Sequence, residues 1–407
     1  MIFYSNGVNE EVMKNFKNFI YTFCSIIVLS IIFVTIMYTY NKTQNFRIES
    51  VGHMLENRIG HSAILLPNSN EVLFVGGSDG ATNNILLNAE ICNFKNETCN
   101  LISMNKRHIM SDIYINSDKN IVIVDNGSIE VFDNIKKQIK LIEENPFGLD
   151  NYINETKRFQ ISNDIVLVSG GKINQKEYFN KGKKEQAITS KVYLYDIKNY
   201  KILKQLNLNV PRSNHQMIFS NNYLYVFGGE STTKENSLFV EKYNPDSETF
   251  EIVGKIKEAR SDFSIFKKGQ YIFLIGGRLK DNIEIYNLEN NTSEIKKKFI
   301  INSDTSLLNY DLNILDINDE NIIFIVKSRN KSLSGLYHYN LNEEKVYKIN
   351  EQAIGSYANI IKFNNNLIIS GGEKQFFLPL KRFKICAIGN LCPYNSATNK
   401  IILVKEK

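Results

Sequence analysis

Residues and motifs that often mark a catalytic or nucleotide-binding chain are scarce in this sequence. Its 407 residues include no tryptophan, six prolines, five cysteines and five histidines, without a cluster at metal-ligand spacing. A Gly-x-Gly-x-x-Gly fingerprint, a Walker lysine and a Gly-x-Ser-x-Gly elbow are all missing. These absences exclude the standard nucleotide-binding loops and the serine-hydrolase elbow, and we expect no catalytic residue, no metal and no cofactor.

A strong charge of one sign is also missing. The net charge of +6 is small for this length, and the lysines are scattered. Short basic runs such as Lys296–Lys298 are typical of solvated loops, whereas a nucleic-acid interface needs a dense basic stripe. We therefore expect no nucleic-acid partner.

A short apolar run that ends in a glycine pair recurs along the chain. The first glycines of five copies are Gly76, Gly170, Gly228, Gly276 and Gly371, at intervals of 94, 58, 48 and 95 residues. Two intervals are about double the others, and each contains a degenerate copy, at 121–127 and 322–326. The period is therefore about 50 residues, repeated seven times, which is typical of a repeat architecture built from one supersecondary unit.

Each repeat predicts four strands. A strand follows an Arg-led turn, an apolar strand ends in Gly-Gly, a third carries a Glu-x-Tyr or Glu-x-Phe step, and a fourth follows a polar turn. Apolar runs bounded by Gly and Asn fit strands that are buried on both faces. The glycines allow a positive φ and a close backbone approach where the strand leaves the sheet.

This pattern, over residues 46–407, resembles the Kelch-repeat β-propellers of the galactose oxidase and Kelch-like superfamily. The resemblance implies an all-β, Kelch-type β-propeller of seven four-stranded blades. Blades two and six lack the glycine pair, and the tryptophan common on the family's fourth strand is absent, so Phe250 or Tyr347 is expected in that role. Either Phe46–Ile48 or Lys400–Val404 is expected to close the ring as an outer strand of the last blade.

The start of the chain predicts a membrane anchor. After a tail of residues 1–18, residues 19–40 are 22 positions without a charge, long enough to cross a bilayer of about 30 Å as a helix. A cleaved signal peptide has a shorter apolar core, of about 7–15 residues. We predict an uncleaved transmembrane signal-anchor helix at 19–40 and a linker at 41–45. Basic residues flank both sides, so the positive-inside rule does not set the orientation.

Four cysteines outside the span form two pairs, Cys92 with Cys99 and Cys386 with Cys392. Each pair flanks the predicted turn between strands three and four, in the first and last blades, which suggests two hairpin disulfides. Cross-blade bridges and reduced thiols are the alternatives, and a zinc site is disfavoured because the spacings are too long. Disulfides indicate an oxidising compartment, which places the propeller outside the cytoplasm.

Five arginines precede the predicted first strands of blades one to five: Arg58, Arg107, Arg158, Arg212 and Arg260. In a four-stranded blade this turn and the turn from strand two to three lie on one face, so the arginines are predicted to ring the propeller mouth there. One interpretation is an anion-binding rim. The other is that each guanidinium ties adjacent blades through backbone carbonyls. His61 and His215 share one repeat position and His108 directly follows Arg107, which favours structural roles for these histidines.

The same face carries a long polar insertion, Lys172–Ser190, after the glycine pair of blade three. Long loops in compact repeats often carry function, and Tyr178 and Phe179 are candidate contacts for a partner, with packing against the blade as the alternative.

Together these features predict a single-pass membrane protein that presents the propeller outside the cytoplasm, in a periplasmic, lumenal or extracellular space, as a non-catalytic binding module. The expected partner is a protein or an acidic sugar on one propeller face. Two alternatives stay open. Resemblance to extracytoplasmic Kelch-type epimerases of sialic acid implies a sugar-processing enzyme with the arginines as a carboxylate clamp, whereas a cytoplasm-facing adaptor requires the opposite topology and reduced cysteines.

Overall fold

The structure is a computed structural model of the chain. It describes residues 21–30 except 24, and residues 46–406 except 80–83, 126, 145, 148–152, 175–185, 279, 281, 299–310, 317–320, 328–334, 341, 344, 351–357, 364–365, 375–395 and 398–399. The chain divides into two compact units, Met1–Arg47 with Lys405–Lys407, and Ile48–Val404.

In the first unit, residues 21–23 and 25–30 are helical and their side chains are exposed. Within the described residues, no helix has the length and the apolar character that a membrane crossing requires. The other positions of the predicted span 19–40, including Cys24, lie outside the described residues, as do the tail 1–18 and the linker 41–45.

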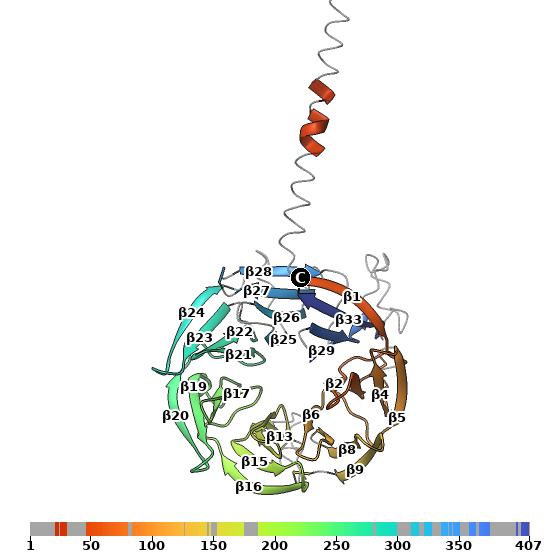
Figure 1. Ribbon diagram of the computed structural model, residues 1–407. Coiled ribbons are helices and arrows are strands. Elements are labelled where there is room, and N and C mark those ends of the chain that lie inside the picture. Colours follow the sequence, from red (N-terminus) through yellow and green to blue (C-terminus); the bar gives the residue numbers. More distant parts are fainter. Residues whose placement is uncertain are drawn as a thin grey trace, which may run out of the picture. The chain divides into compact units, whose positions relative to one another are not determined.

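The second unit is a ring of four-stranded antiparallel sheets, which we call blades where one continuous segment supplies all four strands (Figure 1). Blade 1 contains β2 (Ser62–Leu65), β3 (Glu71–Val75), β4 (Asn88–Asn93) and β5 (Thr98–Ser103). Blade 2 contains β6 (Asp112–Ile115), β7 (Ile121–Val124), β8 (Ser128–Asp133) and β9 (Gln138–Glu144). Blade 3 contains β11 (Lys157–Gln160), β12 (Ile165–Ser169), β15 (Lys191–Asp196) and β16 (Lys201–Asn207).

The next three blades repeat this order. Blade 4 contains β17 (Gln216–Ser220), β18 (Tyr223–Phe227), β19 (Phe239–Asn244) and β20 (Thr249–Lys255), with a short 3₁₀ helix η2 (Asn236–Leu238) before β19. Blade 5 contains β21 (Ser264–Lys268), β22 (Tyr271–Ile275), β23 (Asn282–Asn287) and β24 (Thr292–Lys298). Blade 6 contains β25 (Asp311–Asp316), β26 (Asn321–Lys327), β27 (Gly335–Asn340) and β28 (Lys345–Asn350).

The remaining place in the ring holds a composite sheet, here called the closing sheet. It consists of β29 (Asn359–Phe363), β30 (Asn366–Ser370), β33 (Lys400–Glu406) and β1 (Phe46–His53), paired in the order β29-β30-β33-β1. The all-β propeller predicted from the repeat is confirmed, but the seven equivalent blades are replaced by six blades and this closing sheet. The two segments predicted as alternative closures both contribute, because they occupy adjacent positions and do not compete for one.

Two small sheets are formed by segments that connect the strands of the ring. One pairs β10 (Ile153–Asn154), β13 (Lys172–Asn174) and β14 (Gln186–Ile188), and the other pairs β31 (Glu373–Lys374) with β32 (Ser396–Ala397). The ends of the predicted insertion in blade 3 are therefore strands.

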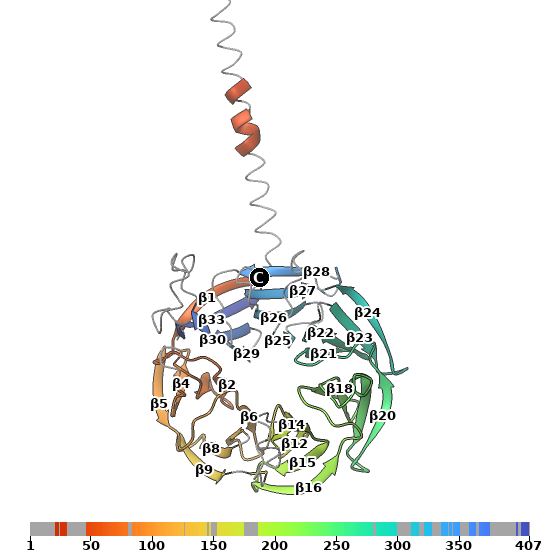
Figure 2. The same ribbon diagram turned by 180° about the vertical axis from the view of Figure 1, so that it is seen from behind.

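The burial of a strand depends on its position in the blade. In Figure 1 and, from behind, Figure 2, strands such as β2 and β6 lie nearest the ring centre and β5 and β16 form the rim. The second strands are apolar and buried, as in β7, where all four residues are buried. The outer strand β16 is mostly exposed. Apolar cores form between neighbouring blades; for example, Leu73 and Ile91 of blade 1 pack with Ile123 and Phe132 of blade 2.

The hairpin between strands three and four uses the same turn chemistry around the ring. An Asn or Asp at the end of the third strand accepts backbone N–H groups two or three residues on, as Asn93 does from Lys95 at 2.9 Å and Asn96 at 3.2 Å. The equivalent residues in blades 2 to 6 are Asp133, Asp196, Asn244, Asn287 and Asn340. Short polar side chains stabilise such turns by this local bond, which explains the polar step in each repeat.

Where a sheet carries a glycine pair, the pair contacts the next sheet. The second glycine donates its N–H to a connector carbonyl of the following blade: Gly171 to Arg212 O at 2.7 Å, and Gly229 to Arg260 O at 2.6 Å. The first glycine faces the same carbonyl. At Gly170, with φ +62°, a Cβ atom would stand 2.2 Å from Arg212 O. Only glycine fits this approach.

We predict that Gly170→Ala destabilises the propeller much more than Gly269→Ala. Gly269 also has a positive φ, +57°, but a Cβ atom added there would have nothing within 4 Å. Left-handed strain alone costs about 1–2 kcal/mol, which is the expected loss at Gly269, and the clash with Arg212 O should at least double it at Gly170. Urea unfolding of both variants measures the difference, and equal losses would show that the close approach between blades is not limiting.

Candidate binding face

One face of the ring carries both the connectors into the blades and the segments that follow the glycine pairs. The two pair directly, since isolated bridges join Ile59 with Ser78 and Ser213 with Glu230. We call this the glycine face. The blade pattern predicts this shared face.

Three of the five predicted arginines are buried within their own blades. Arg58, Arg212 and Arg260 are at most 1% exposed. Arg212 donates to Gly228 O at 2.7 Å, to Phe239 O at 2.7 Å and to the Glu241 carboxylate at 3.1 Å. We call such an arginine with its buried glutamate a clasp. Equivalent bonds join Arg58 to Gly76 O and Glu90, and Arg260 to Gly276 O and Glu284.

The clasp holds the connector onto the blade that it enters. The same glutamate accepts a backbone N–H from three residues before the arginine, as Glu241 does from Asn209 at 2.6 Å. Burial lowers the pKa of Arg212, although the Glu241 charge works against this shift. A buried ion pair of this kind is costly to break, because the remaining charge has no solvent. The burial and bonds of these arginines favour the structural interpretation. The carbonyls that they contact belong to their own blade, however, and not to the adjacent blade.

In blade 2 the clasp position holds His108 instead of Arg107. His108 is fully buried, with Nδ1 2.6 Å from Asp125 Oδ2 and Nε2 2.7 Å from Glu130 Oε2, whereas Arg107 is exposed. Burial lowers the pKa of His108, but its hydrogen bonds to both carboxylates outweigh burial and raise the pKa to about 9. The group is thus an imidazolium that donates from both nitrogens.

Asp125 also replaces the missing glycine pair of blade 2. Its Oδ1 accepts the N–H groups of Gly127 and Ser128, both at 2.7 Å, while Oδ2 takes the bond from His108. In blades 1, 4 and 5 the arginine donates to a glycine carbonyl, whereas in blade 2 the histidine donates to a carboxylate. The clasp cation of blade 2 is therefore His108, the residue after Arg107, and the predicted place of Arg107 on the rim stays a prediction. The buried apolar residue four positions before each clasp cation, Met104 here and Leu208 in blade 4, marks the correct register.

Arg158 is not in a connector but in β11, the inner strand of blade 3. Its side chain is 8% exposed and pairs with Asp112 of blade 2 at 2.7 Å. Of the five arginines, Arg158 therefore makes the tie between adjacent blades, through a carboxylate.

His61 and His215 are contacts between sheets. Each follows a clasp arginine by three residues and bonds the serine before the glycine pair of the preceding sheet: His61 to Ser370 at 2.8 Å and His215 to Ser169 at 2.7 Å. Burial lowers the pKa of His61 to about 3 and that of His215 well below its usual value. Both are neutral at physiological pH. The pairing of Ser-Gly-Gly in one repeat with His in the next is a signal within the sequence that could have identified this contact.

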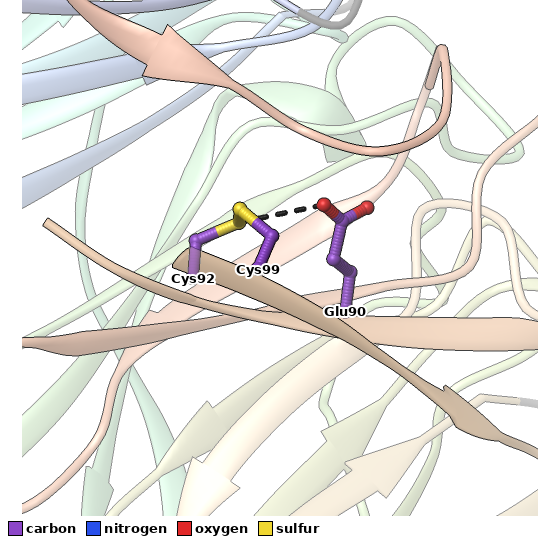
Figure 3. Close-up of side chains that lie close together, drawn as sticks. All are labelled: Glu90, Cys92 and Cys99. Carbon is purple, nitrogen blue, oxygen red and sulfur yellow. Dashed lines mark hydrogen bonds between the residues drawn. A yellow bond between two sulfur atoms is a disulfide. The ribbon is translucent and has the colours of Figure 1, made fainter. Parts of the chain in front are cut away.

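Cys92 and Cys99 form the predicted hairpin disulfide in blade 1 (Figure 3). With Glu90 they bring three potential metal-ligand atoms within 4.8 Å of one another. Because the sulfurs are bonded to each other, they are not thiolate ligands in this form. Cys386 and Cys392 lie outside the described residues, as do Tyr178 and Phe179.

Partly exposed charges gather on the glycine face of blades 3 to 5. Lys172 contacts Glu155 at 2.6 Å and Glu230 at 2.7 Å, and Arg278 contacts Glu230 at 2.9 Å. We call these four residues the charge network. Burial lowers the pKa of Lys172, but the two carboxylates outweigh burial and raise it. The side chain of Arg278 is 62% exposed, so this network, unlike the clasps, is open to a partner.

Two comparisons with known proteins give no relative: no family model matches the chain, and no curated protein matches it. Among solved structures, that of YjhT matches with 12% identity and a TM-score of 0.49, over 87% of this chain and 97% of the YjhT chain. A likeness of this degree gives no basis for transferring a function.

We predict that His108 makes stability fall at alkaline pH. Its pKa is near 6.5 unfolded and about 9 folded, so its contribution is complete below pH 6.5 and is lost as pH rises through 9. The contribution is on the order of 3 kcal/mol. His108→Arg carries the cation of the other clasps. In this variant the free energy of unfolding should not fall between pH 6.5 and 9.5 as it does in the wild type. A wild-type curve parallel to that of the variant would contradict the assignment.

Proposed function

We propose that this chain is a Kelch-type propeller that acts as a non-catalytic binding module, anchored in a membrane and displayed outside the cytoplasm. The observation that carries the binding proposal is the partly exposed charge network on the glycine face of blades 3 to 5, in which Arg278 is the most exposed member. Long, polar connecting segments follow the glycine pairs of blades 3 and 4, and such surfaces on a rigid scaffold commonly carry recognition.

The alternating signs of the network favour a protein partner over an acidic sugar. Lys172 and Arg278 flank Glu230, and Glu155 lies beyond Lys172. A mixed-charge surface complements another mixed-charge surface and gives specificity more than affinity. An acidic sugar would be better served by uncompensated arginines, but Arg58, Arg212 and Arg260 already donate to their own blades.

An enzyme would need titratable groups near the arginines, and the three histidines there are already bonded within the propeller. His61 and His215 are neutral and bonded to serines, and His108 is enclosed by two carboxylates. These contacts support the binding module over the sugar-processing enzyme.

Anchoring is supported by residues 19–40 and by the disulfide. The span carries no charge, and its described helical residues expose large apolar side chains, such as Tyr21 at 73% and Leu29 at 64%. Exposed apolar side chains on a helix need a partner, and lipid is one that suits an uncharged stretch of this length. The Cys92–Cys99 bond fits an oxidising compartment, and so favours display outside the cytoplasm over a cytoplasm-facing adaptor.

The binding face can be tested with a photocrosslinking amino acid placed at Arg278, and at Lys204 as the control. Lys204 also forms an exposed ion pair, with Glu248, but lies on outer strand β16. In cells that produce the full chain, we expect a protein adduct from position 278 and none from 204. Adducts from both positions, or tight binding of acidic oligosaccharides on an array that Lys172→Ala abolishes, would contradict a protein partner at this face.

The topology can be tested with a membrane-impermeant amine reagent on intact cells, any outer membrane having been removed. Lys136 and Lys204 are well exposed, at 63% and 48% of their side chains, and should be labelled without permeabilisation. Lys14, before the predicted span, should be labelled only afterwards. The reverse pattern would establish a cytoplasmic propeller, and release of the protein by alkaline carbonate would contradict the anchor.

A further inference from the structure

The disulfide occupies a position that belongs to an aromatic residue in the other blades. Two residues after the clasp glutamate, on the third strand, blade 1 has Cys92. The equivalent third-strand residues of blades 2 to 6 are Phe132, Tyr195, Tyr243, Tyr286 and Tyr339. In blade 4 this aromatic ring packs on Phe250 of the fourth strand, with centroids 4.8 Å apart. Blade 1 therefore joins strands three and four with sulfur where blade 4 uses ring packing.

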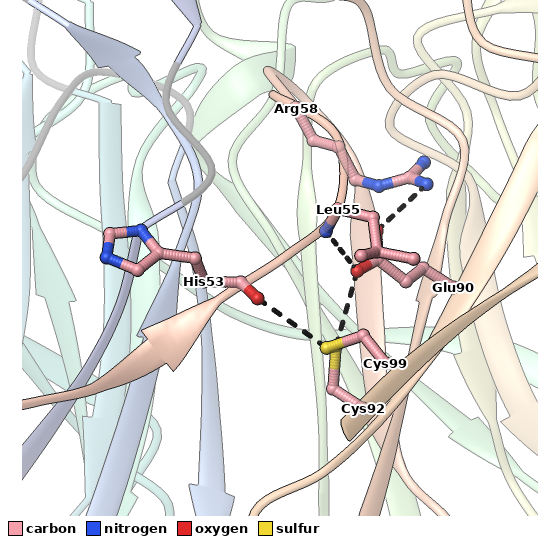
Figure 4. Close-up of a disulfide and its surroundings, with 6 residues drawn as sticks. All are labelled: His53, Leu55, Arg58, Glu90, Cys92 and Cys99. Carbon is pink, nitrogen blue, oxygen red and sulfur yellow. Dashed lines mark hydrogen bonds and ion pairs between the residues drawn. A yellow bond between two sulfur atoms is a disulfide. The ribbon is translucent and has the colours of Figure 1, made fainter. Parts of the chain in front are cut away.

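Each sulfur of the pair lies beside an oxygen that is placed to accept a hydrogen bond (Figure 4). Cys92 Sγ is 3.4 Å from Glu90 Oε1, and Cys99 Sγ is 3.6 Å from the carbonyl oxygen of His53. A disulfide sulfur carries no hydrogen and donates nothing to these oxygens. A thiol at either position would donate S–H to the oxygen beside it.

The two oxygens are fixed independently of the redox state. Glu90 is held by Arg58 and by the N–H of Leu55, as the equivalent glutamates are held in blades without sulfur. His53 is the last residue of β1, the outermost strand of the closing sheet. After reduction the two sulfurs must move apart, but each thiol has an acceptor beside it in a frame that is already in place, so neither is left as an unpaired buried group.

The two sulfurs differ in access. Cys92 is 1% exposed and packs with Val72, Phe74 and Ile368, whereas Cys99 is partly exposed. An external thiolate must attack a disulfide sulfur in line with the bond that breaks. Access therefore selects Cys99 as the attacked sulfur and Cys92 as the leaving group.

We propose that Cys92–Cys99 is a reversible redox pair that exchanges with an external dithiol, and that Glu90 and the His53 carbonyl hold its reduced thiols. One thiolate of the dithiol attacks Cys99 Sγ, and the bond to Cys92 breaks. The second sulfur of the dithiol then attacks the mixed disulfide and releases Cys99. The two protons of the dithiol end on Cys92 and Cys99, and its two sulfurs leave as a cyclic disulfide, so the protein gains two electrons and two protons.

The test is a redox titration of the purified full chain in mixtures of reduced and oxidised dithiothreitol, with alkylation and peptide mass analysis of Cys92 and Cys99. We expect reduction and reoxidation to follow one two-electron curve while near-UV circular dichroism stays native. Glu90→Gln replaces a charged acceptor by a neutral one, so it should shift the equilibrium toward the disulfide, on the order of fivefold. Glu241→Gln, the same change in a clasp without sulfur, should leave the curve unchanged.

Equal shifts in the two variants would overturn the role of Glu90. Should Glu90→Gln fail to fold, the wild-type chain alone decides: loss of native circular dichroism in step with reduction would overturn the reversible pair. Stoichiometric zinc binding by the reduced chain, abolished in Cys92→Ser, would also overturn it and show that the thiols and Glu90 serve a metal. Native-like reduction without zinc binding supports the proposal.

Discussion

A connector carbonyl of one blade presses against the glycine pair of the sheet before it, and the ring depends on this approach. Among the described residues, the bond from the second glycine is present at four junctions, where Gly77, Gly171, Gly229 and Gly372 are the donors. It fixes the separation of neighbouring sheets, and the apolar cores between blades can pack only at that separation. Because a Cβ atom on the first glycine would clash with the carbonyl, this position requires glycine, and the requirement is visible in the sequence.

The clasps depend on the residues that supply these carbonyls. The residue whose backbone oxygen meets the preceding sheet is Arg58, His108, Arg212 or Arg260, and its side chain turns into its own blade. One residue thus joins two sheets, by its backbone on one side and its side chain on the other. What blade 2 retains is a buried cation with two donors, not an arginine, and the compensating carboxylate of Asp125 shows that charge and hydrogen bonding are balanced together.

This double use of one residue explains what could be predicted from the sequence. The propeller followed from glycine spacing because steric exclusion leaves an unambiguous residue, and the Cys92–Cys99 bond followed from its hairpin register. The role of the arginines could not be predicted, because the sequence does not distinguish an arginine that faces solvent from one that is buried in a clasp. Alignment of charged residues pointed to Arg107, whereas the clasp cation of blade 2 is His108, which lies four positions after the buried Met104 as the clasp arginines lie after their own buried apolar residues. The closing sheet was predicted in part: both end segments were expected as closing strands, but as alternatives for one position and not as neighbours.

The internal use of charge also decides where recognition is possible. A propeller whose recurring arginines bond its own carbonyls has to recognise a partner with other residues, and these are free to differ from blade to blade. Lys172, Glu230 and Arg278 hold the same place after their glycine pairs, yet their charges alternate. The repeat fixes the position of these side chains on the glycine face, and the change of residue from blade to blade determines the pattern of charge. The disulfide follows the same logic in blade 1, where a cysteine stands at a position that is aromatic elsewhere. Function in this ring is therefore to be sought where the blades differ, and stability where they agree.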